Sequence, residues 1–366
     1  MVSIAYLVST LERCGPTNQL FYLVSGLDRE HFSPVIVTLS DEPPSTRIQD
    51  FLDLGVPVHC LHLGRPLGLL YGRRRLRRLL GILKPTILHS QFVRADLLSV
   101  FAHSSECTIS TQRNYPWHDY VMYYGRSVGS ALAFLQYLAF RRMDRVIAVS
   151  DYLVALNRKH RMESSRVHNG VDLARFSSPA DHERKSARES LGIAESETVI
   201  LSTGSLIRRK DPFTILEAFL RLDGKSRRLY FVGDGPLLHP ITNRCQNSAR
   251  VQAVGRQTDV RPFLRAADLF VSASWSEGLP NAALEALGTG IPLVLSDIPQ
   301  HREIAETCSE AVLTFRKGDR SALSELLARF RPSQYLRDQA RRAAEKNWDS
   351  SRMAQEYQTI YQTMAL

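Results

Sequence analysis

Short apolar runs alternate with amphipathic segments along the first 180 residues of the chain. The runs are rich in β-branched residues, as strands are, whereas the segments between them carry apolar side chains at helical spacing. Strands are predicted at 3–8, 34–39, 56–63, 86–89, 107–111 and 145–149, and helices at 17–27, 45–54, 71–83, 94–103, 128–140 and 152–160. This alternation predicts a doubly wound parallel sheet.

A polar, helix-poor segment at 176–188 interrupts the alternation and predicts a linker between domains. Beyond it, strands are predicted at 198–203, 228–232, 251–254, 268–273 and 291–296, and helices at 212–222 and 332–366. The predicted fold class is therefore α/β, with two Rossmann-like domains at 1–178 and 179–349 that face a cleft. The last helix, about 350–366, is expected to pack back on the first domain. Ligands of such sheets bind at the carboxyl ends of the strands, so the cleft is the expected site.

Length and composition fit this picture. The chain has 366 residues, of which 44% are hydrophobic and 23% charged, and these proportions exclude a disordered, collagen-like or coiled-coil protein. The longest apolar stretch, 128–140, contains Gln136 and would span only ~20 Å as a helix, so a buried or surface-docked helix is expected. The N-terminal residues predict a strand and no signal peptide. Five scattered cysteines without a CxxC pair argue against a disulfide framework and a zinc site, and favour a reducing cytosol.

The chain is basic, with 47 Lys and Arg against 37 Asp and Glu. The net charge of +10 suggests an anionic partner, and most of the excess lies in the first 180 residues. Five arginines (Arg73, Arg74, Arg75, Arg77 and Arg78) lie within six residues on a helix backed by leucines. The run fits a helix on an anionic membrane, and an ordinary basic surface helix is the alternative. Nucleic-acid binding is disfavoured, because no aromatic residues are interleaved with the arginines as stacking platforms.

Common phosphate-binding motifs are absent. Phe219 and Leu238 replace glycines that a P-loop and a dinucleotide fingerprint need, and no Asp-x-Asp pair is available to hold a metal–diphosphate. The most informative segment is instead 274–292. There Pro280 predicts a helix start whose amides can bind an anion, and Glu277 and Glu285 lie eight positions apart. One carboxylate can then meet a group beyond the phosphates and the other a ribose, the alternative being two surface carboxylates.

Other loops follow strands of the same predicted sheet. Gly204 ends one strand before three consecutive cations, Arg208, Arg209 and Lys210, and a glycine turn at 233–235 follows the next strand. The carboxyl ends of parallel strands share one edge, so these loops are expected to converge near Glu277.

At these residues the chain resembles the retaining GT-B glycosyltransferases of family four, also called glycosyltransferase group 1, along essentially its whole length. The resemblance is carried by Val146-Ile-Ala-Val-Ser150, Asn169-Gly-Val-Asp172-x3-Phe176, Gly204-x5-Lys210, Val232-Gly-Asp-Gly-Pro236, Asp268-Leu-Phe-Val-Ser-Ala-Ser274 and Glu277-Gly-Leu-Pro-Asn-x3-Glu285-Ala.

The resemblance implies a role for each matching residue. Lys210 with a neighbouring arginine would neutralise the donor diphosphate, as a metal ion does elsewhere. Glu277 would contact the donor sugar and Glu285 the ribose. The remaining donor-binding residues that it implies are Gly15 and Gly204 near the diphosphate, Gly255 near the base, and the segment Gly278, Leu279, Pro280 and Asn281 near sugar and phosphate.

The chain also departs from the family pattern. Ser205 stands where the diphosphate arginine is common, so Arg208 or Arg209 is expected to substitute for it. In the first domain Arg113 stands where a donor-contacting histidine is common, and His118 lies close enough along the chain to reach the same space. Arg113 and His118 are therefore predicted jointly as catalytic residues, beside Glu277, Lys210 and Arg209.

Together with the resemblance, these features predict a retaining glycosyltransferase that needs no metal or other cofactor. It would move a hexose-type sugar from a nucleotide diphosphate sugar, with UDP favoured over GDP, to a glycan or lipid-linked acceptor in cell-surface polysaccharide assembly. The first domain would bind the acceptor and the second the donor. The expected location is the cytoplasm, peripheral on the inner, anionic face of the cell membrane, and no nucleic acid is expected as a partner. The alternatives are a GT-B nucleotide-sugar epimerase or phosphorylase, and a non-catalytic membrane-binding protein.

Overall fold

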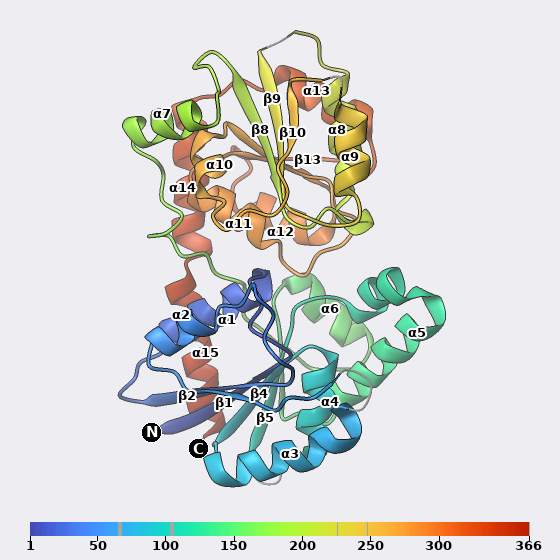
Figure 1. Cartoon of the computed structure of the whole chain (residues 1–366), viewed down its shortest axis with the longest axis vertical. Helices are drawn as coiled ribbons and strands as arrows, with labels where there is room; N and C mark the ends of the chain where they lie inside the picture. Colours follow the sequence, from blue (N-terminus) through green and yellow to red (C-terminus); the bar gives the residue numbers. More distant parts are fainter. Residues whose placement is uncertain (65–67, 103–105, 225, 247, 366) are drawn as a thin grey trace. The chain divides into compact units, whose positions relative to one another are not determined.

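The computed structural model describes residues 1–64, 68–102, 106–224, 226–246 and 248–365. The chain forms two compact α/β units (Figure 1). The first unit comprises Met1–Gly170 and Ser350–Leu366, and the second comprises Val171–Asp349. The predicted fold class is confirmed, since each unit is built on a parallel sheet with helices packed on it.

The first unit contains a seven-stranded sheet in the order β3-β2-β1-β4-β5-β6-β7. All neighbouring strands pair in parallel. The strands are β1 (Val2–Val8), β2 (Phe32–Thr38), β3 (Val58–Cys60), β4 (Ile87–Gln91), β5 (Cys107–Gln112), β6 (Arg145–Ala148) and β7 (Ser165–Arg166). The inner strands are almost continuously apolar because both faces of the sheet are covered.

Helices cover both faces of this sheet (Figure 1). The helices are α1 (Gly15–Ser25), α2 (Ile48–Asp53), α3 (Gly68–Leu83), α4 (Val93–Ala102), α5 (Pro116–Phe140), α6 (Asp151–Lys159) and α15 (Ser350–Met364). One apolar core joins the sheet to α1, α2 and α15, and α15 supplies Met353, Ala354, Tyr357 and Tyr361 to it. A second core joins the opposite face to α3 and α4.

Helix α5 is longer than the predicted helix at 128–140 and is bent in the middle. Gly125 has φ +77°, and a Cβ on Gly129 would lie 2.4 Å from the carbonyl oxygen of Tyr120, so the second arm folds back closely on the first. Gln136, which interrupts the apolar stretch, is buried and joins both arms to α4. It accepts a hydrogen bond from Tyr120 Oη at 2.6 Å and donates one to Asp96 at 2.6 Å. Among the described residues, no helix is both long and apolar enough to cross a membrane.

The second unit contains a six-stranded parallel sheet in the order β10-β9-β8-β11-β12-β13. Its strands are β8 (Thr198–Thr203), β9 (Arg227–Val232), β10 (Val251–Ala253), β11 (Leu269–Ser272), β12 (Leu293–Ser296) and β13 (Val312–Phe315). Its helices are α7 (Asp181–Ser190), the short 3₁₀ turn η1 (Arg208–Lys210), α8 (Pro212–Leu220), α9 (Leu238–Cys245), α10 (Arg261–Ala266), α11 (Asn281–Gly288), α12 (Pro299–Thr307), α13 (Arg320–Arg329) and α14 (Gln334–Asn347). Helices α8, α9 and α13 share one apolar core with the sheet.

The predicted linker at 176–188 is wrong, because α7 begins within it. Helix α7 is polar, yet its Arg184 and Arg188 bind the buried carboxylate of Asp268, at the entrance of β11, at 2.7 and 3.3 Å. Arg337 of α14 binds the same carboxylate at 3.3 Å. Ion pairs, rather than an apolar face, therefore attach α7, and apolar periodicity does not detect such a helix.

Two further boundaries differ from the sequence prediction. The first unit ends at Gly170 rather than near residue 178, because the next residues pack within the second unit. Val171 donates a backbone hydrogen bond to Trp348 at 2.7 Å, and Arg341 donates to the carbonyl oxygen of Phe176 at 2.9 Å. The predicted helix at 332–366 is two helices, α14 and α15, separated by the buried side chain of Trp348.

Candidate functional site

The order of strands marks one place in each sheet where a ligand is expected. Strand β8 lies between β9 and β11, so the loops that follow β8 and β11 leave the sheet in opposite directions. In the first sheet β1 and β4 have the same relation. Ligands of doubly wound sheets bind at such switch points, at the carboxyl ends of the strands. Most of the predicted site residues follow these four strands.

The loops that follow β8, β9 and β10 are packed tightly against one another. Gly204 follows β8, and a Cβ on Gly233, after β9, would lie 1.9 Å from the carbonyl oxygen of Gly204. Gly233 in turn donates a backbone hydrogen bond to Gly255, after β10, at 2.9 Å. The structure thus brings the predicted Gly204 and Gly255 into one cluster, where a side chain at 233 has no room.

Glu277 lies at the centre of the site in the second unit. It follows β11, its side chain is buried, and it binds two cations from η1. Lys210 Nζ lies 2.5 Å from Glu277 Oε1, and Arg209 Nη1 lies 3.0 Å from Oε2 and also contacts the carbonyl oxygen of Ser276. The structure therefore brings Glu277, Lys210 and Arg209 together as one ion cluster, whereas Arg208 of the same turn is exposed.

The electrostatic surroundings keep Glu277 ionised. Burial alone would raise the pKa of its carboxyl, but the adjacent Lys210 and Arg209 outweigh burial and hold that pKa far below its usual range. With two cations for one carboxylate, the cluster carries a net positive charge beside the switch point of the sheet. Such a cluster suits an anionic ligand.

Three side chains to which the sequence analysis assigned no role fix the Glu277 turn. Ser274 Oγ donates to Glu277 Oε1 at 2.6 Å, and Gln300 of α12 donates to the backbone carbonyl of Glu277 at 2.5 Å. The turn is held further by Ser296 Oγ, which donates to the carbonyl oxygen of Ser274 at 2.6 Å. Residues 296 and 300 are remote in sequence from the motif, so only the folded chain reveals their contacts.

Glu285 has the opposite surroundings. It lies on α11, and its partly buried side chain makes no hydrogen bond or ion pair with any residue in the described ranges. Loss of hydration raises the pKa of its carboxyl to about 7, against a smaller opposing effect of Arg175. A carboxylate with open acceptor positions can bind paired hydroxyl groups.

The segment between the two glutamates is buried. Gly278, Leu279 and Pro280 lead from the Glu277 turn into α11. The helix begins at Asn281, one residue later than predicted, and Pro280 is its extended N-cap residue with ψ 102°. Backbone amides at this helix start are therefore adjacent in sequence to the ion cluster.

In the first unit, Arg113 follows β5 and forms no ion pair with a carboxylate in the described part of the chain. It donates from Nε to Gln91 at 2.8 Å and from Nη1 to Asn169 at 3.1 Å, both of which are neutral side chains. Burial lowers the pKa of its guanidinium, because the charged form loses hydration that no carboxylate in the described ranges replaces. Arg113 is therefore well suited to an anion that the protein itself does not supply.

The other predicted residues of the first unit lie separately. Gly15 opens α1 after β1. His118 is exposed in the first turn of α5 and its ring packs edge-on against Tyr115, with centroids 4.8 Å apart. No hydrogen bond or ring contact within the described chain joins His118 to Arg113. His89, at the end of β4, is buried between Tyr361 and Thr111, and burial lowers its pKa to about 3, which indicates a structural role.

The arginine-rich run lies on α3. Leu76 and Leu80 are buried in the core, and all five arginines point outward with exposed side chains. Arg75 and Arg77 donate to backbone carbonyls, and Arg73, Arg74 and Arg78 have no hydrogen-bond or ion-pair partner among the described residues. The bend of α5 adds an apolar surface to the same unit, at Met122, Tyr123, Tyr124 and Val128, each at least 50% exposed.

Two glycosyltransferase family models match the chain, one over each half. The family described as "Glycosyltransferase Family 4" matches residues 14–175, and the family described as "Glycosyl transferases group 1" matches residues 183–347.

Individual relatives match at different lengths. The O-antigen biosynthesis glycosyltransferase WclY of Escherichia coli is 23% identical over 386 residues, which cover 99% of each chain. The UDP-Gal:alpha-D-GlcNAc-diphosphoundecaprenol alpha-1,3-galactosyltransferase of Escherichia coli is 32% identical over 145 residues. That match covers 37% of this chain and only 37% of the relative. The solved structure of Anabaena HepE in complex with UDP and glucose has a TM-score of 0.83 at 16% identity, covering 98% of this chain and 99% of HepE, and supports the fold alone.

Proposed function

Because the chain belongs to the group 1 glycosyltransferases of family four, we propose that it transfers a hexose-type sugar from a nucleotide diphosphate sugar to a glycan acceptor in cell-surface polysaccharide assembly. We further propose that transfer retains the anomeric configuration and needs no metal ion. A UDP-sugar is the favoured donor, with a GDP-sugar second. The crystallised HepE binds UDP, and a relative matched over part of its length is named for a UDP-galactose donor.

The ion cluster around Glu277 carries this proposal. Lys210 and Arg209 are cations held in fixed positions by a buried carboxylate, at the place where a doubly wound sheet binds its ligand. Fixed cations stabilise the negative charge that builds on a leaving diphosphate, and they need no reorganisation during the reaction. Lys210 and Arg209 are proposed to act on the diphosphate, and Glu277 to orient them and meet the hydroxyls of the donor sugar.

Glu285 completes the donor site in this proposal. Its unpaired carboxylate would accept hydrogen bonds from the two ribose hydroxyls, and the buried segment Gly278–Asn281 would follow the phosphates and sugar. As the resemblance implies, Gly255 would lie near the base and Gly204 near the diphosphate. Both glycines belong to loops that pack against Gly233, where a side chain has no room.

The first unit is proposed to bind the acceptor and to supply Arg113 to the reacting groups. Its guanidinium binds the neutral side chains of Gln91 and Asn169 and no carboxylate of the described residues, so the approach of a phosphate or of a developing negative charge would offset the cost of its burial. Gly15 would allow the backbone to approach the diphosphate. His118 remains the second candidate, and its exposure suits contact with an acceptor.

The decisive experiment incubates the protein with UDP-, GDP- and TDP-sugars and measures release of the nucleotide diphosphate. Turnover is expected with one donor, and Lys210→Ala should lower kcat by at least about 100-fold, the effect of losing one electrostatic stabiliser. Lys185→Ala is the matched control, because Lys185 is exposed on α7. Excess EDTA should leave turnover unchanged. Near-normal turnover of Lys210→Ala, or loss in EDTA that Mg²⁺ restores, would contradict the proposed charge stabilisation.

The same assay separates the alternatives. An epimerase changes the sugar nucleotide without releasing the nucleotide diphosphate, and a phosphorylase requires inorganic phosphate. A non-catalytic protein gives no turnover with any donor.

The location on a membrane is a separate part of the proposal. The first unit carries exposed arginines on α3 and exposed apolar side chains at the bend of α5, and each arginine near an anionic bilayer contributes ~1 kcal/mol. The protein should sediment with phosphatidylglycerol vesicles and much less with phosphatidylcholine vesicles. Replacing Arg73, Arg74 and Arg78 together by Gln should release it, whereas the exposed Arg302 and Arg316 replaced by Gln should not. Equal binding to both kinds of vesicle would contradict this location.

A further inference from the structure

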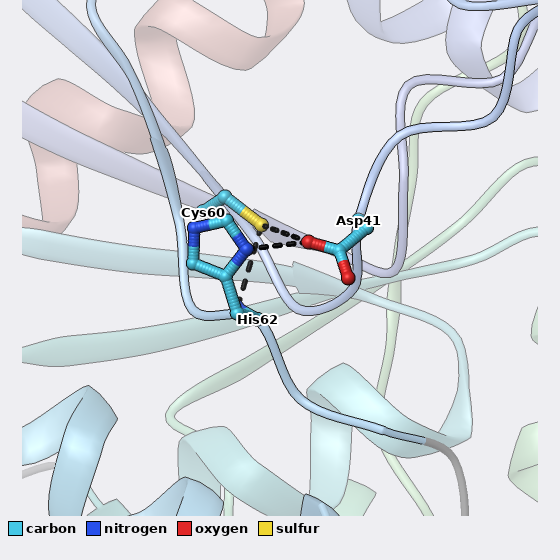
Figure 2. Close-up of side chains that lie close together, drawn as sticks. All are labelled: Asp41, Cys60 and His62. Atoms are coloured by element: carbon cyan, nitrogen blue, oxygen red, sulfur yellow. Dashed lines mark hydrogen bonds and ion pairs between the residues drawn. The ribbon is translucent and has the colours of Figure 1, made fainter.

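A second cluster of chemically reactive side chains lies in the first unit, on the edge of the sheet. Asp41 follows β2, Cys60 ends β3, and His62 follows it (Figure 2). Figure 2 shows the side chains of Cys60 and His62 next to each other, and strand pairing of Thr38 with Cys60 brings Asp41 close to them. Their donor atoms, Asp41 Oδ1, Cys60 Sγ and His62 Nδ1, all lie within 4.8 Å of one another.

The chemistry of this donor set is specific. Sulfur, imidazole nitrogen and carboxylate oxygen together suit Zn²⁺ and similar transition metals, whereas Mg²⁺ and Ca²⁺ prefer oxygen alone. A thiolate and a carboxylate would also balance the two positive charges of the ion. Three protein ligands leave one tetrahedral position for water or a solute, as in open zinc sites.

The backbone around the cluster is held in place. His62 adopts the left-handed conformation with φ +51°, which is uncommon for a residue with a side chain. Arg75 of α3 donates to the carbonyl oxygens of Leu61 and His62 at 2.9 and 3.2 Å, and the backbone amide of His62 donates to Cys60 Sγ at 3.4 Å. An amide that donates to the sulfur stabilises the thiolate form that a metal requires.

The side chains themselves are free to adjust around an ion. His62 Nδ1 and Asp41 Oδ1 share a hydrogen bond, the Cys60 thiol donates to the carbonyl oxygen of Ser40 at 3.4 Å, and the Asp41 and His62 side chains are 79% and 69% exposed. An ion between them would replace the shared hydrogen bond, with His62 coordinating through Nδ1 and keeping its proton on Nε2. The thiol would give up its proton to solvent, so that one proton leaves as the Zn–S bond forms.

From this arrangement we propose that Asp41, Cys60 and His62 form a binding site for a zinc-type divalent transition metal ion. The site goes beyond the proposed transferase activity and does not depend on it. A chelator that strips this ion should leave glycosyl transfer intact, because the ion cluster around Glu277 lies in the other unit.

Metal binding would also restrict the motion of the loop that leads to Gly15. Asp41 is followed by Glu42, whose carboxylate accepts hydrogen bonds from Leu11 and Thr46. The backbone amide of Leu11 lies 3.0 and 2.9 Å from its two oxygens, and the hydroxyl of Thr46 lies 2.6 Å from one of them. Arg13 donates a backbone hydrogen bond to Ser45 at 2.8 Å. An ion that fixes Asp41 would therefore restrict the loop at 40–46 and, through it, the segment at 11–14.

The test uses the full chain, reduced and freed of metal with a chelator, and titrates it with Co²⁺ as a spectroscopic substitute for Zn²⁺. We expect one equivalent to give a thiolate-to-cobalt charge-transfer band in the near ultraviolet, which Zn²⁺ then abolishes by displacement. Cys60→Ser should remove the band, and His62→Gln and Asp41→Asn should each weaken Zn²⁺ binding by at least about 100-fold, since even outer-shell changes cost 10–100-fold. Thermal unfolding without metal shows whether each variant is folded.

Two matched controls sharpen the result. Cys14→Ser removes an exposed thiol of the same unit. His31→Gln removes an exposed histidine that pairs with Asp28 at 2.8 Å and belongs to no cluster of three ligand residues in the described chain. Both should keep the band and the affinity. A band that survives Cys60→Ser, or no band at all in the folded wild-type chain, would overturn the site. Amide exchange at Leu11 should slow when Zn²⁺ is bound, and unchanged exchange would overturn its coupling to the Gly15 loop.

Discussion

Glu277 and Glu285 lie eight positions apart in one short segment, yet the pKa values of their carboxyl groups are shifted in opposite directions. Glu277 is buried against Lys210 and Arg209, and its pKa lies far below the usual range because these cations outweigh burial. Glu285 has no partner among the described side chains, and burial raises its pKa to about 7. The first carboxylate is held in place by two cations of the protein, whereas the second has no such partner among the described residues and is open to a ligand.

This difference suggests a division of labour. A carboxylate tied to two fixed cations can orient groups near a reacting centre without moving, which favours a role in the chemical step. A carboxylate that is buried without a partner has lost hydration, and hydrogen-bond donors of a ligand would offset that loss. This favours a role in binding. Three predictions test whether the two glutamates are divided in this way.

The largest effect is expected for Glu277→Gln. Loss of its charge releases Lys210 and Arg209 from their fixed positions and removes the carboxylate that meets the transferred sugar, so kcat should fall by at least about 100-fold. Affinity for the free nucleotide diphosphate, measured by calorimetric titration, should not fall, because both cations remain. Glu306→Gln, an exposed carboxylate on α12, is the control. A parallel loss of nucleotide affinity would mean that Glu277 serves binding instead.

A smaller and different effect is expected for Glu285→Gln. A contact with the ribose is made about equally in the ground and transition states, so its loss should raise the donor KM by roughly tenfold and leave kcat within about twofold. The same variant should weaken binding of the free nucleotide diphosphate by a similar factor. If kcat falls instead and the nucleotide still binds normally, the ribose assignment fails.

The sequence predicts one part of this comparison better than the other. Both glutamates, Lys210 and the helix between them follow from the motif, because strand ends and a helix start fix where these residues lie. The motif does not predict that Lys210 and Arg209 pair with Glu277. From the sequence, the cations are assigned to a ligand, and their partner 67 and 68 positions away emerges only in the folded chain.

The fold shows the same limit. Buried parallel strands are continuous apolar runs and are therefore predicted close to their observed positions. Helix α7 is missed because Arg184 reaches Asp268 84 positions away, and such an ion pair leaves no periodic signal. The bend of α5 is missed because it depends on Gly125 and on the close approach of Gly129 to Tyr120. Neither hydrophobic periodicity nor a sequence motif connects Asp41 with Cys60 and His62. The sequence therefore does not predict this cluster, and only the folded chain shows it.

The smallest effect concerns stability, and it should have opposite signs for the two glutamates. In the unfolded chain both carboxyl groups titrate near their ordinary pKa of about 4.3. The folded pKa of Glu277 is lower, so its carboxylate adds stability above that pH, and this stability is lost as the pH falls through the acid range. The folded pKa of Glu285 is raised to about 7, so the folded state holds that proton more tightly, and the stability it adds at low pH is lost as the pH rises through about 7.

Thermal unfolding at pH 5 and pH 8 should therefore show that Glu285→Gln raises the unfolding midpoint at pH 8 and changes it little at pH 5. Glu277→Gln should lower the midpoint at pH 8, because two partly buried cations lose their counter-charge. Midpoints of both variants that move in the same direction at pH 8 would mean that the two carboxylates do not differ in their electrostatic surroundings.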